Sequence, residues 1–290
     1  MKRLSATLFT GAGLAAYSLV EPFLFRLRRV VVPLVAPGAP RLTLLHISDT
    51  HFLAGDDRLQ RFLAGIPEEL GAEPDLVIAT GDLIEDDTGI DPAVQSLSGL
   101  AARHGRFYVL GSHDYYQSVF QAYSKYVTKK RPTRAPPADT DRLESGLGDT
   151  GWRPLTNATE FVESDVGRIR LAGVDDPYLD RHRTDHIERG PEDVLAIGAM
   201  HAPDVVSEFA LAGFDLALAG HTHGGQVRPP LLGTVVTNCS LPRELGARFN
   251  RVGDTWLHVS PGLGTSPFSP IRFNCRPEAT LLELRPARGL

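Results

Sequence analysis

The sequence predicts an α/β layered fold, and three observations lead to this prediction. Short, nearly continuous apolar runs recur along the chain, which is typical of strands that are buried on both faces. Stretches with the length and pattern of helices separate several of these runs. Aspartate or histidine directly follows most of the runs, as expected where a ligand site forms at the carboxyl ends of parallel strands.

The composition is that of an ordinary globular protein. The chain has 290 residues, of which 42% are hydrophobic and 22% charged, and its formal net charge is −5. This mild acidity argues against a nucleic-acid-binding protein. Cys239 and Cys275 are too few for a disulfide scaffold or a thiolate zinc cluster, so we expect two buried thiols. No internal repeat is present, and no heptad pattern indicates an oligomeric state.

The N-terminal run from Leu4 to Val20 contains no charged residue. At ~1.5 Å per residue a helix of this length reaches roughly 25 Å, a little short of a bilayer core. A single membrane anchor is our favoured interpretation; a secretory signal and an interfacial or packed helix are the alternatives. Three arginines soon after the run outnumber the two basic residues before it, which favours a cell-membrane protein whose main domain is cytoplasmic, with export as the alternative. We assign residues 1–28 to this segment and 29–290 to the main domain.

The expected elements of the main domain follow in order. Arg29–Val35 is predicted to be an edge strand, because Pro33 cannot donate to a neighbouring strand. Eight further apolar runs are predicted strands: Leu42–Ile47, Leu76–Ala79, Phe107–Leu110, Ile169–Val174, Val194–Ala199, Leu216–Ala219, Trp256–Val259 and Thr280–Leu284. Helices are expected at Asp57–Leu70, Pro92–Arg103 and Asp204–Leu211. The Pro-rich and charged stretch Thr128–Thr150 is expected to be a long surface loop.

Five polar clusters at the predicted strand ends carry the chemistry. They are Asp49-x-His51, Gly81-Asp82, Gly111-Ser112-His113-Asp114, His201 and Gly220-His221-x-His223. Any single cluster has a plain structural explanation, such as a helix cap or a buried polar residue. Together, carboxylate and imidazole ligands without thiolates suit Mn²⁺, Fe²⁺ or Zn²⁺. Two histidines that flank one residue can bind two neighbouring ions, and a lone aspartate such as Asp82 can bridge them.

In this order the five clusters resemble the motifs DxH, GD, GNH[DE], H and GHTH of the calcineurin-like metallophosphoesterase family. The resemblance extends from about Leu42 to Leu284. The run from Gly220 to Gln226 is similar to that of a membrane-associated bacterial subgroup, which includes proteins resembling UDP-2,3-diacylglucosamine pyrophosphohydrolases. The resemblance implies a four-layer α/β/β/α sandwich, with a metal site at the carboxyl ends of the strands.

The resemblance also implies a role for each residue of the clusters. Asp49, His51 and His223 would hold a first metal ion, and Asp82 would bridge to a second ion held by His201 and His221. His113 would act near the leaving group, oriented by Asp114. One residue departs from the family pattern, since Ser112 stands where the family has an asparagine that binds the second metal. A serine hydroxyl is shorter and a weaker ligand, so we expect looser binding there.

The activity implied is hydrolysis of a phosphodiester or pyrophosphate by a metal-bound hydroxide at a dinuclear centre, with Mn²⁺ preferred over Fe or Zn. The apolar N-terminus would tether the protein to a membrane and suggests a lipid-linked or nucleotide-linked substrate. Two alternatives remain. One is a broad phosphomonoesterase, and the other is a membrane-tethered scaffold with a weakened second metal site, which Ser112 alone favours.

Overall fold

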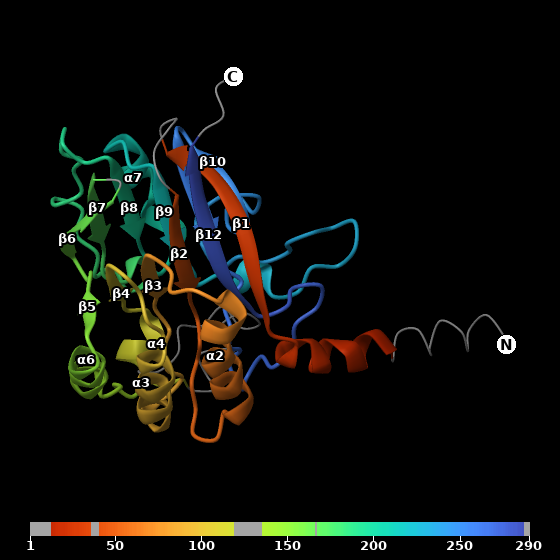
Figure 1. The fold of residues 1–290 in the computed structure, drawn as a ribbon. Coiled ribbons are helices and arrows are strands. Elements are labelled where there is room, and N and C mark those ends of the chain that lie inside the picture. Colours follow the sequence, from red (N-terminus) through yellow and green to blue (C-terminus); the bar gives the residue numbers. More distant parts are fainter. Residues whose placement is uncertain (1–12, 36–40, 119–134, 166, 287–290) are drawn as a thin grey trace, which may run out of the picture.

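The computed structural model describes residues 13–35, 41–118, 135–165 and 167–286. Their framework is two six-stranded sheets (Figure 1). The strands of the first sheet lie in the order β1 (Arg26–Val35), β12 (Glu278–Pro286), β2 (Leu42–Ile47), β3 (Leu76–Thr80), β4 (Gly105–Val109) and β5 (Trp152–Pro154). Those of the second lie in the order β10 (Arg248–Val252), β11 (Thr255–Val259), β9 (Leu216–Ala219), β8 (Leu195–Ala199), β7 (Gly167–Gly173) and β6 (Ala158–Ser164).

Both sheets are parallel at their centres. Strands β2 to β5 run parallel in the first sheet, and β11, β9, β8 and β7 run parallel in the second. Antiparallel pairs join β12 to β2, β10 to β11 and β6 to β7. Parallel neighbours carry their carboxyl ends to one edge, so the polar clusters that follow β2, β3 and β4 share one side of the first sheet.

The alternation of side chains along the strands explains the layering. Leu44 and Ile78 of the first sheet pack with Leu171 and Ile197 of the second, which places one apolar core between the sheets. The neighbouring residues Leu45 and Val77 face the other way.

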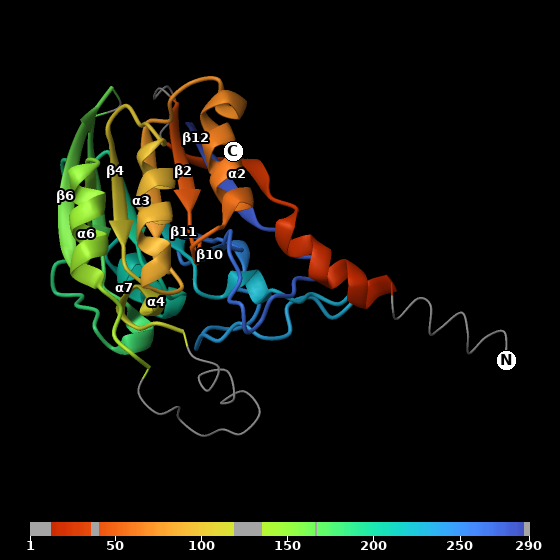
Figure 2. The same ribbon diagram turned by 90° about the horizontal axis from the view of Figure 1, so that it is seen from below.

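Helices cover the outer face of each sheet. On the first sheet they are α2 (Asp57–Leu70), α3 (Ile90–Ser98) and α6 (Thr140–Asp149); on the second, it is α7 (Val206–Leu211) (Figure 2). The four-layer α/β/β/α sandwich is therefore confirmed.

Helix α2 shows why the local prediction succeeded. Leu59, Leu63 and Ile66 recur at helical spacing and are all buried against the first sheet. Gly71 ends the helix in the left-handed conformation (φ 74°), and its N–H donates to the carbonyl of Pro67.

The stretch expected as a loop at Thr128–Thr150 is partly helical, and this expectation was wrong for α6. Leu143 and Leu147 are four residues apart and fully buried, while the Asp139 side chain accepts a hydrogen bond from the Arg142 N–H and caps the helix. The prolines and charges that suggested a loop lie before the helix or on its exposed side. Residues 128–134 of the stretch lie outside the described residues.

The N-terminal part enters the fold earlier than the expected boundary at residue 29. Residues 13–20 are helical, η1 (Glu21–Phe23) follows, and β1 already pairs with β12 at Arg26. β1 is an edge strand, as Pro33 predicted. The first part of the apolar run, residues 4–12, lies outside the described residues. Within the described ranges no helix combines the length and apolar character needed to cross a bilayer.

Candidate metal centre

The strand ends bring the predicted clusters together from both sheets. Asp49 and His51 follow β2, and Asp82 follows β3. Ser112, His113 and Asp114 form the short helix α4 (Ser112–Tyr115) after β4, whereas His201 follows β8 and His221 follows β9. His223 begins η5 (His223–Gly225). Residues far apart in the sequence therefore share one buried site.

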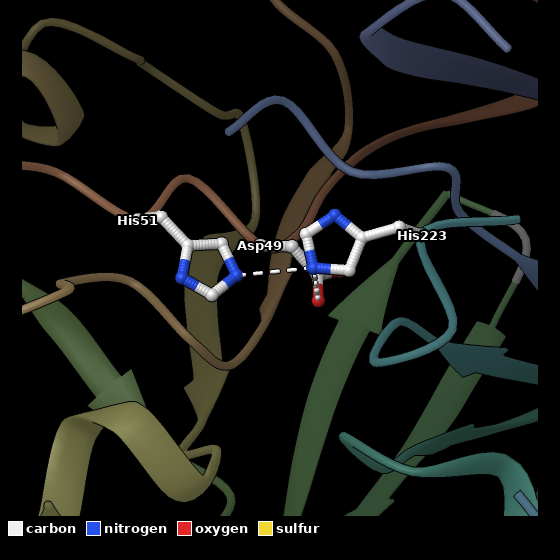
Figure 3. A group of neighbouring side chains, drawn as sticks. All are labelled: Asp49, His51 and His223. Carbon is white, nitrogen blue, oxygen red and sulfur yellow. Dashed lines mark hydrogen bonds and ion pairs between the residues drawn. The ribbon is translucent and has the colours of Figure 1, made fainter. Parts of the chain in front are cut away.

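The first group consists of Asp49, His51 and His223 (Figure 3). The Nε2 atom of His223 lies 3.5 Å from Oδ1 of Asp49 and 3.1 Å from Nε2 of His51. One ligand atom from each residue lies within 4.8 Å of the other two. Two imidazole nitrogens and a carboxylate oxygen facing one point form a set that a divalent cation can bind.

The second group is centred on Asp82 and His201. Nε2 of His201 lies 3.2 Å from Oδ2 of Asp82, and it is buried without a hydrogen-bond partner among the described residues. Nε2 of His51, from the first group, lies 3.7 Å from the same Asp82 oxygen. The ring of His221 stands edge-on to that of His201 at 5.1 Å between centroids. Asp82 thus lies between the two groups, and Nε2 of His201, beside the Asp82 carboxylate, is placed to bind a second cation.

Hydrogen bonds on the far side of two imidazoles leave one nitrogen of each free to bind metal. Nδ1 of His201 contacts the Thr80 carbonyl at 2.8 Å, and Nε2 of His221 contacts the Asn238 carbonyl at 3.0 Å. Because a carbonyl only accepts, each of these nitrogens carries the proton. In the neutral form of each ring, Nε2 of His201 and Nδ1 of His221 then keep their lone pairs, as metal-binding histidines require.

His51 is oriented by Glu85, a residue that the sequence analysis missed. Nδ1 of His51 donates to Oε2 of Glu85 at 2.6 Å, and Ser266 donates to the other carboxylate oxygen at 2.5 Å. Burial alone would raise the pKa of Glu85, but the hydrogen bond and charge of His51 lower it to about 2. Burial likewise opposes the protonation of His51, yet Glu85 raises the pKa of His51 to about 9. The only sequence signal was an acidic residue three positions after Asp82.

The pKa values of the site's histidines shift in opposite directions: that of His201 is raised, and those of His221 and His223 are lowered. Against the effect of burial, the negative charge of Asp82 holds the pKa of His201 well above its usual value. Burial alone would raise the pKa of Asp82, but the charges of His201 and His113 hold it well below its usual value. Burial lowers the pKa of His221 to about 4 and keeps the pKa of His223 well below its usual range. His221 and His223 are therefore neutral at pH 7, the protonation state in which imidazole binds metals.

The backbone of the site is strained at the predicted ligands. Five residues have positive φ angles of 46° to 64°, a conformation that residues other than glycine rarely adopt: Asp49, His51, Asp82, His221 and His223. Glycine is required where chains approach closely, because a Cβ on Gly111 would overlap the Asp82 carboxylate and one on Gly220 would overlap Ser48.

The cluster around α4 differs from the expectation in one respect. The Asp114 carboxylate accepts hydrogen bonds from the backbone N–H groups of Leu83, Ile84 and Gly111, and not from the His113 ring. Nδ1 of His113 instead contacts the Ser118 hydroxyl at 2.7 Å. Asp114 therefore fixes the loops that hold the site.

The imidazole of His113 faces the site. Its Nε2 lies 4.0 Å from Oδ2 of Asp82, and its backbone N–H donates to the other Asp82 oxygen. Ser112 is half-buried at the start of α4, and no described residue is hydrogen-bonded to its hydroxyl. The hydroxyl is thus not committed to a protein partner in the described part of the chain.

Comparison with known proteins gives a consistent result. The sequence profile described as calcineurin-like phosphoesterase matches residues 42–225. The chain is 26% identical over 259 residues to the uncharacterized metallophosphoesterase YkoQ of Bacillus subtilis, covering 86% of this chain and 85% of that protein. It is also 26% identical over 287 residues to the phosphodiesterase YaeI of Escherichia coli, covering 97% of this chain and 96% of that protein.

Proposed function

The chain belongs to the calcineurin-like phosphoesterase family, whose members hydrolyse phosphoester bonds with divalent metal ions, and from this premise we propose a dinuclear phosphodiesterase or pyrophosphohydrolase. One observation carries the proposal. Nε2 of His51, from the first group, and Nε2 of His201, from the second, lie 3.7 Å and 3.2 Å from the carboxylate of Asp82, so imidazoles of both groups flank this one carboxylate. A site for one ion would not need ligands on both sides of the carboxylate.

The proposed roles follow from position. Asp49, His51 and His223 hold the first ion, Asp82 bridges, and His201 and His221 hold the second. Two divalent cations, when bound, lower the pKa of a water molecule and neutralise charge on the phosphoryl oxygens. The donor set of imidazoles and carboxylates suits Mn²⁺, which we place ahead of Fe²⁺ and Zn²⁺. His113, which faces Asp82 from the short helix α4, gives a proton to the leaving oxygen.

The substrate and the location of the enzyme are further parts of the proposal. A diester or pyrophosphate that is linked to a lipid or a nucleotide fits an enzyme held at a cell membrane by its apolar N-terminus. We propose the cytoplasmic face, because more arginines follow the apolar run than precede it. The relation to the UDP-2,3-diacylglucosamine pyrophosphohydrolase subgroup is part of the same proposal, and it is supported by the run from Gly220 to Gln226.

The test uses the full-length protein and a soluble diester. Hydrolysis of bis(p-nitrophenyl) phosphate is titrated with Mn²⁺, and the His221→Ala variant is compared with His104→Ala. His104 is the matched control because it lies at the amino-terminal end of β4, away from the metal centre. We expect Mn²⁺-dependent turnover that only His221→Ala abolishes.

Two outcomes would favour the alternative functions. Faster turnover of p-nitrophenyl phosphate than of the diester, at equal metal loading, would indicate a phosphomonoesterase. Binding of metal by a folded protein without turnover of either compound, across Mn²⁺, Fe²⁺ and Zn²⁺, would favour the scaffold.

A further inference from the structure

Exposed apolar side chains are concentrated in one region of the molecule. Of the seventeen large apolar residues that are exposed in the described part of the chain, eleven belong to three short segments. These are Leu14, Tyr17, Leu19, Val20 and Phe23; Leu231, Leu232, Val235 and Val236; and Phe268 and Ile271. Leu231 is fully exposed and Leu232 is 74% exposed. Such concentration is unusual on a soluble surface and indicates a binding face.

The three segments are joined to one another. The Arg272 N–H donates to the Ser18 carbonyl at 2.9 Å, and the rings of Tyr17 and Phe273 meet edge-on. The Gln226 side chain, five residues before the second segment, donates to the carbonyls of Ser269 and Ile271 in the third, which holds the start of the loop of residues 226–236 beside the third segment. Figures 1 and 2 both show the helix of residues 13–20 and the loop after η5 projecting on the same side. We call the eleven side chains together the apolar face.

The apolar face carries no exposed charge. Residues 13–24, 229–236 and 266–271 contain a single charged residue, Glu21, and its side chain is buried as the acceptor of the Asn274 and Cys275 N–H groups. The sequence that leads into this face, residues 4–12, is also uncharged.

Arginines border the apolar face on one side. Arg58 and Arg61 of α2 line a hollow together with apolar residues of the first segment: Leu19, Val20, Phe23, Leu24 and Phe25. The Arg58 guanidinium lies 4.7 Å above the Phe23 ring. Neither arginine forms a salt bridge with any described residue. Apolar side chains bordered by unpaired cations suit the acyl and phosphate layers of an anionic bilayer.

We propose that the apolar face docks on an anionic phospholipid bilayer, with residues 231–236 inserted at its interface. The uncharged chain that enters the face and the two arginines at its border suit an anionic lipid surface, with apolar acyl chains beneath a layer of phosphates. A single inserted segment binds a membrane weakly, whereas two signals hold it stably. Here the loop of residues 231–236 supplies a second contact beside the N-terminal helix.

The docked orientation would bring the metal centre to the membrane surface. The loops of the apolar face also hold site residues: Asn238 accepts from His221, and Ser266 donates to Glu85. Arg272, next to Ile271, approaches Nδ1 of His223 at 3.3 Å. This part of the inference rests on the proposed function and names its substrate class as a phosphoester whose other end is embedded in the bilayer. The docking itself requires no catalysis.

The experiment places a fluorescent probe in the loop of the full-length protein. Leu232→Trp and Leu211→Trp are mixed with phosphatidylcholine–phosphatidylglycerol vesicles whose acyl chains carry bromine, and the emission of the native tryptophans is subtracted. Leu211 is the matched control because it is 88% exposed on α7, which lies on the opposite side of the molecule from residues 13–20 (Figures 1 and 2). We expect bromine to quench the indole introduced at position 232 strongly and to leave the control unquenched.

A second variant measures the strength of the contact. Leu231→Asp with Leu232→Asp should weaken vesicle partitioning by about tenfold or more, because two exposed leucines no longer enter the interface. Unchanged thermal melting and metal content verify that the variant folds.

Several outcomes would overturn the proposal. Vesicle binding without quenching at position 232 would mean that the N-terminal segment alone holds the protein. No vesicle binding would exclude a lipid surface, and a concentration-dependent dimer that shifts the emission at position 232 without lipid would make the occupant a second copy. Failure of the proposed function would be recognised separately, since hydrolysis of the soluble diester needs no vesicles.

Discussion

Nδ1 of His46 and Nδ1 of His258 lie 2.7 Å apart between the two sheets, and both side chains are buried. The contact belongs to a chain of hydrogen bonds that ends at a predicted metal ligand. Nε2 of His46 contacts the Thr80 hydroxyl, Thr80 donates to Ser48, and Ser48 donates to Oδ2 of Asp49 at 2.5 Å.

The carboxylate of Asp49, at the end of this chain of hydrogen bonds, determines which group donates and which accepts at each step. A ligating carboxylate only accepts, so Ser48 gives its one proton to Asp49 and must accept from Thr80. Thr80 in turn accepts from Nε2 of His46, which leaves Nδ1 of His46 to accept from His258. His46 is therefore neutral with its proton on Nε2, and Nδ1 of His258 carries the proton that it donates to His46.

The first prediction concerns the pH dependence of stability. Burial, with the positive charge of Arg28, lowers the pKa of His258 to about 3, and burial with the charge of His258 keeps the pKa of His46 well below its usual value. Below pH 6.5 the unfolded chain binds protons that the folded protein does not, so stability falls as pH decreases from 6.5 toward 3. At pH 5 the loss from His258 is about 2 kcal/mol. Urea unfolding of the metal-free protein at pH 5 and pH 7 measures this change in the free energy of unfolding.

The His258→Gln substitution isolates the part of the pH dependence that His258 causes. His258→Gln keeps a donor for His46 but does not titrate, so its stability should change less between pH 7 and 5. His104→Gln removes a histidine outside the pair and should retain the wild-type dependence. An equally steep loss in both variants would assign the effect to other groups.

Glu85 is predicted to set the affinity of the first metal. Glu85→Gln removes the charge that stabilises the His51 N–H and should weaken Mn²⁺ binding by roughly 10- to 100-fold, as for other partners of ligating histidines. Calorimetric titration with Mn²⁺ provides the measurement, with the exposed Glu68→Gln as control. Wild-type affinity in Glu85→Gln would show that His51 is held by its surroundings alone.

Ser112 is predicted to weaken the second metal site. Ser112→Asn adds an amide oxygen that reaches farther from the same backbone position, so the second equivalent of Mn²⁺ should bind more tightly than in wild type. Metal content after dialysis against limiting Mn²⁺ distinguishes the two proteins. A variant that binds its second ion no more tightly would refute the idea that Ser112 limits this site.

His113 is predicted to protonate the leaving group and not to bind metal. His113→Ala should retain both metal ions and lose turnover by roughly 10²- to 10⁴-fold. The loss should be smaller for a p-nitrophenyl ester, whose leaving group needs little protonation, than for an alkyl ester. Loss of metal in this variant would instead make His113 a ligand.

Local sequence signals predicted the elements whose pattern is decided within a few residues. The periodic leucines of α2 and the apolar runs of β2 and β9 needed no long-range information. Helix α6 was missed because prolines and charges dominate the stretch around it, although Leu143 and Leu147 determine its packing.

At the metal centre, too, the sequence predicted the residues that follow buried strands but not the contacts between separate loops. The order of the motifs predicted which histidines and aspartates gather, because each follows a buried strand. Glu85, Asn238 and Ser118 were not predicted, because their contacts depend on how separate loops meet in space. The backbone contacts of the Asp114 carboxylate were not predicted for the same reason.

The left-handed backbone at five site residues has an evolutionary consequence. Each such residue costs of order 1 kcal/mol of stability that an ordinary loop would keep. An Asp82→Gly change would relieve the backbone strain and remove a metal ligand in a single step. A protein no longer selected for activity would therefore gain stability as it lost its metal site. At these five positions the chain therefore exchanges stability for the placement of metal ligands.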